Sequence, residues 1–166
     1  LEFAEKISKS GTHPIIGTEI NFLIHGVVGK LPLFATNQQG YKSLIKLSSK
    51  SYLETNEKSD PQCKLTDLIN FGSGLIVLSG NYQGLFGKLF KLNRLKQIEE
   101  TFKKLNEIFR DKFYLEIQRH DDSGEEAYEN YLINTSGKLE IPLIASQEIF
   151  YLNKDMYEAH DALTCI

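Results

Sequence analysis

Short, largely apolar segments alternate with longer amphipathic ones along most of this chain, and this alternation is the strongest constraint on its fold. The apolar segments are PIIGTEINFLI (14–24), LPLFA (31–35), GLIVLSG (74–80), FYLEIQ (113–118) and IPLIAS (141–146). Strands that read as near-continuous apolar runs are typical of parallel sheets that helices cover. The alternation therefore predicts an α/β fold with a parallel arrangement of strands.

The amphipathic segments of the first half predict helices. Asn37 is placed to cap a helix that runs to about Glu54. The i, i+3, i+4 spacing predicts that the apolar face of this helix consists of Tyr41, Leu44, Ile45, Ser48 and Tyr52. The polar segment 55–64 contains a proline and predicts a surface loop, and residues 65–71 predict a short helix.

The second half continues the pattern. Residues 84–110 predict a long helical region that is broken near Asn93. Its apolar stripe is assigned to the core and consists of Leu95, Ile98, Phe102, Leu105 and Phe109. The segment EEAYENYLINTSGK (125–138) predicts a further helix, with Gly137 close to its C-terminal cap.

Both ends of the chain have helical patterns. The segment LEFAEKISKSG lacks an initiator methionine, and Gly11 is expected to end this first helix. The segment MYEAHDALTCI is amphipathic and has no stop signal. A length of 166 residues suits one domain. We therefore expect a single domain over residues 1–166 that is cut from a larger protein at both ends.

Charge and cysteine content exclude several classes of protein. A net charge of −3 and a pI near 5.8 provide no basic field for binding nucleic-acid phosphates. Cys63 and Cys165 lie far apart and outside any CxxC motif, which favours a reducing compartment over a disulfide framework. No apolar run approaches the roughly 20 residues that span a bilayer, and no signal peptide is visible. We expect a cytoplasmic protein without a membrane segment.

Polar side chains stand in or just after four of the apolar segments. They are Glu19, Asn81, Glu116, Gln118, His120, Gln147 and Glu148. Ligands and catalytic groups gather at the carboxyl ends of strands in parallel α/β folds, and these side-chain types suit a divalent cation. Simpler interpretations stay open: Glu19 could pair with a neighbouring lysine, and His120 could face solvent from its loop.

No local motif names a reaction. The chain has no HxH, HExxH or CxxC metal motif, no glycine-rich phosphate loop and no GxSxG nucleophile motif. His13, His25 and His160 are not expected to bind a metal ion.

Six segments are specific in combination: PIIGTEINF, LPLFATNQQGYKSLIKLSSKSYLE, GLIVLSGNYQGLFGKLF, FYLEIQRH, IPLIASQEIFYL and MYEAHDALTCI. In order and spacing they resemble the PHP (polymerase and histidinol phosphatase) domain family, and more narrowly the PHP domains of bacterial DNA polymerase III alpha subunits. The resemblance covers essentially all 166 residues. It implies an incomplete, distorted (β/α)7 barrel that lacks its first strands, with the polymerase palm beyond Ile166. Unpaired strand edges in such a barrel predict self-association.

The resemblance also assigns metal-ligand positions residue by residue. The glutamate that the family places after I-I-G-x corresponds to Glu19, and the histidine of its E-L-Q-x-H stretch corresponds to His120. Active members have a cysteine after L-S-G, where this chain has Asn81.

The family's N-D-x-H segment is Q-E-I-F here (147–150), so Glu148 replaces an aspartate and Phe150 replaces a histidine. A benzene ring has no lone pair for a cation, and zinc-type sites need three or four well-placed donors. Glu19, His120 and Glu148 thus become remnant ligand positions.

This pattern is similar to degenerate PHP domains on which a separate proofreading exonuclease, the epsilon subunit, docks. The resemblance therefore implies a non-catalytic scaffold within the catalytic alpha subunit that copies the chromosome. The implied partners are the rest of the parent chain and the epsilon subunit, with DNA bound through the parent. No cofactor or divalent metal is expected in this segment, whereas the parent polymerase would use Mg²⁺.

Two alternatives stay open. In the first, Glu19, His120 and Glu148 hold a metal ion whose bound water hydrolyses phosphoesters, as a 3′–5′ exonuclease or a pyrophosphatase. In the second, the chain is a free-standing phosphoesterase of the histidinol-phosphatase kind. The stretches GYKSLIKLSS and EAHDALTCI argue against the second, because they look specific to polymerases.

Overall fold

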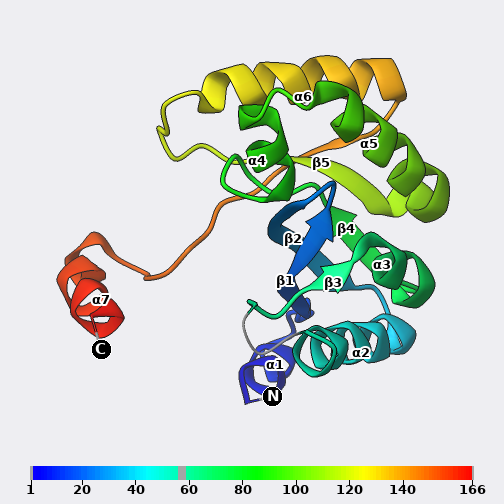
Figure 1. Cartoon of the computed structure of the whole chain (residues 1–166). Coiled ribbons are helices and arrows are strands. Elements are labelled where there is room, and N and C mark those ends of the chain that lie inside the picture. Colours follow the sequence, from blue (N-terminus) through cyan, green and yellow to red (C-terminus); the bar gives the residue numbers. More distant parts are fainter. Residues whose placement is uncertain (1, 56–58, 166) are drawn as a thin grey trace.

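A six-stranded sheet forms the centre of the structure, a computed structural model that describes residues 2–55 and 59–165 (Figure 1). In the order β3-β1-β2-β4-β5-β6 the strands are β3 (Cys63–Lys64), β1 (Gly17–Ile24), β2 (Val27–Ala35), β4 (Leu75–Leu78), β5 (Phe113–Ile117) and β6 (Leu143–Ala145). The pairs β1–β2 and β2–β4 are antiparallel, and the other three pairs are parallel. The α/β class predicted from the sequence is confirmed, but the prediction of a parallel arrangement throughout is wrong, because the sheet is mixed. Across the described residues the sheet is open, with β3 and β6 at its edges.

A two-residue turn that the sequence analysis did not identify causes the antiparallel pairing. His25 and Gly26 have φ angles of 51° and 76° and connect β1 to β2, so that Ile24 pairs with Val27. Positive φ at both central residues is what a type I′ hairpin turn requires; glycine adopts it freely and histidine more readily than most residues. The chain therefore reverses at once instead of crossing over through a helix, and the second strand begins at Val27 rather than at residue 31.

Helices precede, connect and follow the strands. They are α1 (Glu2–Lys9), α2 (Gln38–Leu53), α3 (Leu65–Phe71), α4 (Leu85–Lys91), α5 (Leu95–Phe109), α6 (Glu125–Leu139) and α7 (Tyr157–Thr164), with short 3-10 turns at Arg110–Lys112 and Lys154–Met156. Asn37 caps α2 as predicted, because its side-chain oxygen accepts a hydrogen bond from the Gly40 N–H at 3.0 Å. The predicted break between α4 and α5 is also confirmed at Asn93, where φ is 55°.

The predicted apolar face of α2 is confirmed at Leu44, which is buried, and Ser48 is partly buried, but the prediction is wrong for the other three residues. Tyr41, Ile45 and Tyr52 are 41%, 50% and 70% exposed. The buried residues of α2 are Gly40, Ser43, Leu44, Leu47 and Ser51. Small side chains on this face let the helix lie close to the turn before β4, where the Ser43 hydroxyl donates to the Ser73 carbonyl at 2.8 Å. The close packing of the α2 backbone against this turn therefore determines which face of α2 is buried, and Tyr41, Ile45 and Tyr52 stay exposed.

The end of α6 also differs from the prediction. Gly137 lies in the last turn of the helix, near its C-terminal cap as predicted, and α6 continues one residue farther than predicted, to Leu139. The residue in the left-handed conformation that ends the helix is Glu140, with φ of 54°. Glycine usually occupies this position, whereas here a glutamate adopts it.

One continuous core lies between the sheet and the helices. Alternate residues of the hairpin, Ile20 and Phe22 in β1 and Leu31 and Leu33 in β2, are buried in it. The stripe along α5 is buried as predicted from Ile98 to Phe109. Aromatic rings join the layers, with ring centroids of Phe86 and Phe102 at 4.6 Å and of Phe102 and Phe113 at 5.7 Å. Such pairs add roughly 0.5–1.5 kcal/mol each to the free energy gained by burial.

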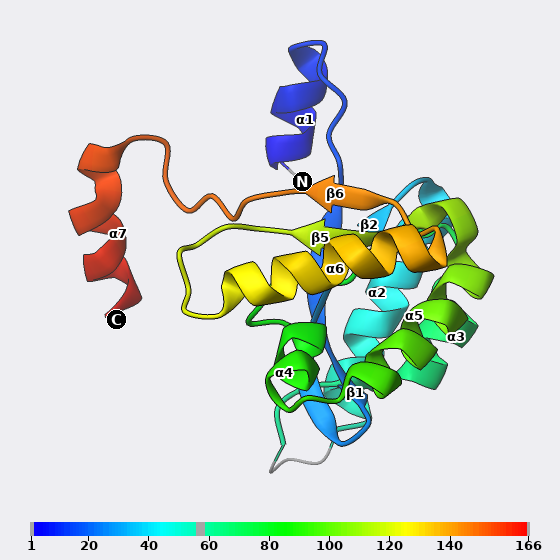
Figure 2. The ribbon, with the colours of Figure 1, turned by 90° about the horizontal axis from the view of Figure 1, so that it is seen from above.

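The terminal helices lie outside this core. Neither α1 nor α7 has a buried residue, and α7 stands apart from the sheet at the end of an extended segment in both views (Figures 1 and 2). In the part of the chain that the structure describes, no helix combines the length and the hydrophobicity that crossing a bilayer requires.

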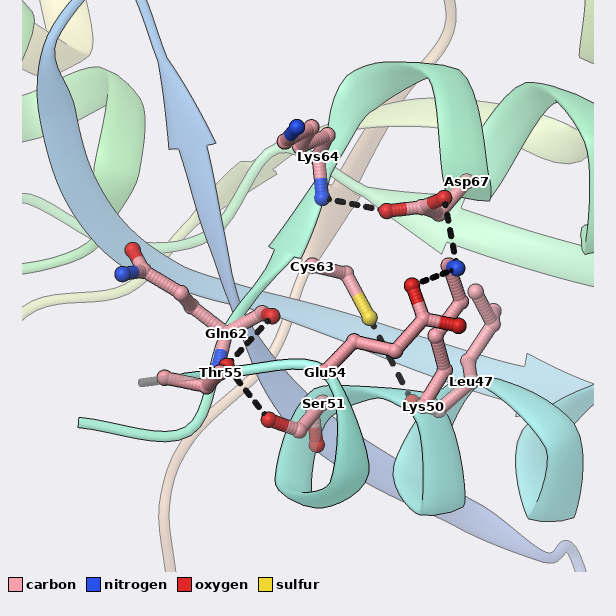
Figure 3. A network of polar contacts seen from close by, with 9 residues as sticks. All are labelled: Leu47, Lys50, Ser51, Glu54, Thr55, Gln62, Cys63, Lys64 and Asp67. Carbon is pink, nitrogen blue, oxygen red and sulfur yellow. Dashed lines mark hydrogen bonds and ion pairs between the residues drawn. The ribbon is translucent and has the colours of Figure 1, made fainter. Parts of the chain in front are cut away.

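A polar network attaches β3 to α2 and α3 (Figure 3). The Thr55 hydroxyl donates to the Ser51 carbonyl at 2.6 Å and accepts from the Gln62 N–H at 3.1 Å. The Asp67 carboxylate accepts from the Lys64 N–H at 2.7 Å. The segment predicted as a loop over 55–64 therefore ends in a short strand, and its residues 56–58 lie outside the described residues.

Cys63 belongs to this network through its buried thiol, which donates to the Leu47 carbonyl at 3.3 Å. Burial raises the pKa of the thiol from 9.0 to about 11; the Asp67 carboxylate adds to this and the Lys50 ammonium opposes it. A thiol with a raised pKa is a poor nucleophile, since only the thiolate reacts. Cys63 is therefore a packing residue of the β3 attachment.

Replacing Gly40 with alanine is expected to destabilise the fold, because the new Cβ would overlap the Gly74 carbonyl oxygen. Overpacking of this kind costs about 1–3 kcal/mol. The matched control is Gly137→Ala, whose Cβ meets nothing within 4 Å inside α6 and which should stabilise the fold by about 0.5–1 kcal/mol. Urea unfolding followed by circular dichroism measures both variants; equal stabilities for the two variants would contradict this packing.

Alkylation should separate the two cysteines. A rise in the thiol pKa from 9.0 to about 11 leaves roughly a hundredfold less thiolate at pH 8, so iodoacetamide should modify Cys63 far more slowly than the exposed Cys165. Mass spectrometry of peptides from the folded chain over time measures both rates. Denaturation in urea is the control, because it should make the two rates similar. Comparable rates in the folded chain would refute the burial of Cys63.

Candidate functional site

Three polar segments meet where β4, β5 and β6 end. They are residues 79–81, 118–120 and 146–148, and each follows its strand directly. Because these three strands are parallel neighbours, their carboxyl ends lie at the same edge of the sheet. The β1–β2 hairpin adds the side chains of the face that does not pack on the core, among them Glu19 and Lys30.

The residues that the resemblance assigned as ligand positions share one cavity. It has a volume of about 420 Å³, and its lining includes Glu19, Asn81, His120, Glu148 and Phe150. Gln147 lines an adjoining cavity of about 280 Å³, which also contacts Glu19 and Glu148. The structure thus brings together side chains that are spread over about 130 residues of sequence.

Amide groups connect these side chains. The Asn81 amide donates to the Gln118 side-chain oxygen at 3.0 Å and reaches Glu148 at 3.5 Å. The same Gln118 oxygen lies 2.9 Å from His120 Nε2. The Gln147 amide lies 3.2 Å from His120 Nδ1. An amide oxygen only accepts and an amide nitrogen only donates, so the geometry fits a neutral His120 with its proton on Nε2.

Gln118 is itself fixed by buried groups below the cavity. Its amide nitrogen donates to Glu116 and to the Ser146 hydroxyl, both at 3.0 Å. Ser146 also donates to Glu116. The Glu116 side chain is only 2% exposed, and the backbone N–H of Glu116 donates to Ser79 at 2.9 Å. This network joins the ends of β4, β5 and β6 to one another.

Glu19 lies inside β1 rather than at a strand end. Its carboxylate is 3.0 Å from Lys30 Nζ, and the Glu19 side chain is 37% exposed. The pairing with a neighbouring lysine that the sequence left open is therefore what the structure contains. Because both groups face solvent, such a pair contributes at most about 1 kcal/mol to stability.

Glu148 and Phe150 lie at the outer side of the cavity. Glu148 is exposed, and Phe150 is 65% exposed with its ring centroid 5.4 Å from that of His160. Phe150 brings no nitrogen or oxygen to the cavity. The wall at this position is thus an apolar ring.

The loop that carries His120 is held at both sides. The Glu125 carboxylate accepts from the His120 N–H at 2.8 Å. Arg119 binds Glu129 through two hydrogen bonds of 2.9 and 2.6 Å, and this contact lowers the pKa of the Glu129 carboxyl. The backbone on either side of the imidazole is therefore anchored to α6.

Sequence reasoning missed further polar lining residues, among them Asn21, Lys30, Lys88 and Asp122. Asn21 and Lys30 alternate with apolar residues in β1 and β2, so recognising the turn at His25–Gly26 would have placed them on the face of Glu19. Lys88 Nζ donates to the Val28 carbonyl at 2.9 Å. Asp122 accepts from the Gln83 amide at 2.5 Å. No sequence pattern predicts either the Lys88 contact or the Asp122 contact.

The described residues contain no group of three or more histidine, cysteine, aspartate or glutamate side chains arranged to hold a metal ion. At the cavity, Glu19, His120 and Glu148 lie along the lining. The Asn81 amide contacts Glu148, and the Gln118 and Gln147 amides contact His120. The arrangement offers carboxylate and amide oxygens and an imidazole whose two nitrogens are both in contact with amides.

Comparison with known proteins identifies similar chains. The family model described as "PHP domain" matches residues 1–120. The chain is 38% identical to DNA polymerase III subunit alpha of Rickettsia bellii, and the alignment covers the whole chain and 14% of that relative. It is 32% and 30% identical to the proteins of the same name from Caulobacter vibrioides and Vibrio cholerae, again over the whole chain and 15% of each relative.

The chain thus spans only about one-seventh of the length of these relatives. The family model matches well over half of the chain. We conclude that this chain belongs to the PHP domain family.

Proposed function

We propose that this chain is a non-catalytic part of the PHP domain in a bacterial replicative DNA polymerase, where it serves as a scaffold and as a docking surface for the proofreading exonuclease subunit. The observation that carries the proposal is the engagement of His120. Nε2 of the imidazole contacts the Gln118 oxygen and Nδ1 contacts the Gln147 amide. A metal ligand needs a free lone pair on one of these nitrogens, so binding would first require this network to break.

Two substituted positions support the same proposal. Asn81 stands where active members have a cysteine, and it donates its amide protons to Gln118 and Glu148. Phe150 stands where active members have a histidine and presents an apolar ring to the cavity. Each substitution exchanges a strong ligand for a group that ligates weakly or not at all.

The similarity to alpha subunits supports the place of the chain in replication. On this proposal, nucleotide polymerisation with Mg²⁺ and the binding of DNA belong to the rest of the parent chain, in the cytoplasm where the chromosome is copied. The six strands would form part of an incomplete, distorted (β/α)7 barrel. Its open edges at β3 and β6 would be the places where further strands, or a second copy of the chain, pair.

An exposed apolar segment supports the docking role. The residues after β6 include Ile149, Leu152 and Leu163, which are 79%, 88% and 67% exposed. Contiguous exposed apolar surface commonly marks a protein–protein contact. The proposed exonuclease contact therefore includes the segment from residue 149 to α7.

A second candidate function is a metal-dependent phosphoesterase. The observation that favours it is that Glu19, His120 and Glu148 line one cavity. In that case the residues would hold a divalent ion whose bound water attacks a phosphoester. Glu19 would first have to leave Lys30, and His120 would have to leave one of its amide partners.

Restoring the lost ligands should restore metal binding. The double variant Asn81→Cys with Phe150→His is expected to bind Zn²⁺ at least tenfold more tightly than the unmodified chain, because it adds a thiolate and an imidazole to the cavity. Isothermal titration with Zn²⁺ measures the affinities, and Asn81→Ser with Phe150→Ala is the matched control. Stoichiometric metal in the unmodified chain, together with hydrolysis of a model phosphodiester, would overturn the scaffold proposal in favour of the phosphoesterase.

Charge placed on the exposed segment should weaken docking. Leu152→Asp is expected to reduce binding of the cognate exonuclease subunit by at least tenfold, because an interface core excludes unpaired charge. Leu53→Asp is the control, since Leu53 is 83% exposed at the far end of α2. Surface plasmon resonance with immobilised exonuclease subunit measures both. Undiminished binding of Leu152→Asp would refute this contact, and no binding of the unmodified chain would refute docking itself.

A further inference from the structure

Three buried polar atoms below the candidate site have no hydrogen-bond partner among the described residues. They are one carboxylate oxygen of Glu116 (Oε2), one of Glu125 (Oε1) and the hydroxyl of Tyr128. The three side chains are 2%, 7% and 2% exposed. Leaving such a group unsatisfied costs about 1–3 kcal/mol, and more for a charged one. Three such atoms in one region therefore call for a common explanation.

The three side chains line the same small cavity between β5 and α6. Its volume is about 10 Å³, which is close to the space that one water molecule needs. The other oxygen of each carboxylate is already engaged, since Glu116 Oε1 accepts from Gln118 and Glu125 Oε2 accepts from the His120 N–H. Glu116 Oε2 and Glu125 Oε1 are thus the carboxylate oxygens that remain available to a molecule in the cavity.

Donor and acceptor roles determine what fits there. An ionised carboxylate only accepts hydrogen bonds, whereas a phenol can donate one. Burial raises the pKa of Tyr128 well above its usual range, and the neighbouring Tyr131 and Glu116 add to this, so the phenol keeps its proton. The nearby Ser79 hydroxyl lowers the pKa of Tyr128 by a smaller amount, but among the described residues the Tyr128 hydroxyl has no partner within full hydrogen-bonding geometry.

We propose that this cavity binds one ordered water molecule, which donates to Glu116 Oε2 and Glu125 Oε1 and accepts from the Tyr128 hydroxyl. This assignment uses each of the water's two protons and one of its lone pairs, and it satisfies all three buried atoms. Buried waters typically make about three such bonds. A cation would bind the two carboxylates but would leave the proton of Tyr128 without an acceptor.

The bound water would position the His120 segment. It joins Glu116 in β5 to Glu125 at the start of α6, and Glu125 holds the backbone N–H of His120. The water is therefore a support, below the candidate site, of the loop that carries the imidazole. This role is independent of whether the site holds a metal ion.

Tyr128→Phe tests the proposal, because it removes the hydroxyl and keeps the ring in its aromatic contacts with Tyr82 and Phe90. Tyr131→Phe is the matched control, since its hydroxyl faces the Leu95 carbonyl at 3.5 Å instead of this cavity. We expect amide hydrogen exchange of His120 in the 166-residue chain to become several-fold faster in Tyr128→Phe and to stay unchanged in Tyr131→Phe. Equal exchange in the two variants would overturn the positioning role.

A crystal structure that resolves ordered solvent tests the occupant directly. A single peak at hydrogen-bonding distance, about 2.7–3.0 Å, from all three oxygens is the expected result. An empty cavity would overturn the proposal. So would a peak at metal–oxygen distances of about 2.0–2.6 Å, which would identify a cation instead.

Discussion

The carboxylate of Glu116 is almost fully removed from solvent, and an unpaired charge in that position would be severely destabilising. The hydrogen bonds that it receives from Gln118 and Ser146 are therefore a requirement of the fold. They fix which way the Gln118 amide points, with its nitrogen toward the carboxylate and its oxygen toward the cavity. That oxygen in turn requires donors, which are Asn81 and the Nε2 proton of His120. The buried carboxylate of Glu116 thus determines, through Gln118, the tautomer of an imidazole four residues farther along the chain.

The hydrogen-bond chain from Glu116 through Gln118 to His120 explains why the side chains of the candidate site are engaged with one another instead of being free metal ligands. Once Nε2 carries the proton, the remaining lone pair of His120 lies on Nδ1, and there the Gln147 amide faces it. Glu19 is similarly paired with Lys30 across the hairpin. The cavity keeps its place at the ends of β4, β5 and β6, but its side chains satisfy one another. The proposed scaffold function follows from this mutual satisfaction rather than from any one substitution.

Much of this arrangement was predictable from the sequence. The apolar segments located five of the six strands, and the stripe along α5 located part of the core. The strand ends located Asn81, His120 and Glu148 in the cavity. The mixed sheet was missed because a two-residue turn with histidine at its first position carries a weak signal, although both residues need positive φ. The face of α2 was missed because periodicity weighs large apolar side chains, while contact with the Gly74 turn selects small ones. The amide network had no signal, since it depends on residues far apart in sequence.

The β1–β2 hairpin also has a consequence for how the chain folds in time. Its two strands are joined by only His25 and Gly26, so their pairing closes a very short loop and pays little chain entropy. Isolated hairpins form within about 1–10 μs, whereas the parallel pairs β4–β5 and β5–β6 must wait until the intervening helices have brought distant segments together. The early hairpin would then be the template on which β4 pairs next, and the polar ends of β4, β5 and β6 would be assembled last. In such an order the cavity is a late product of folding, formed only after the apolar core has closed.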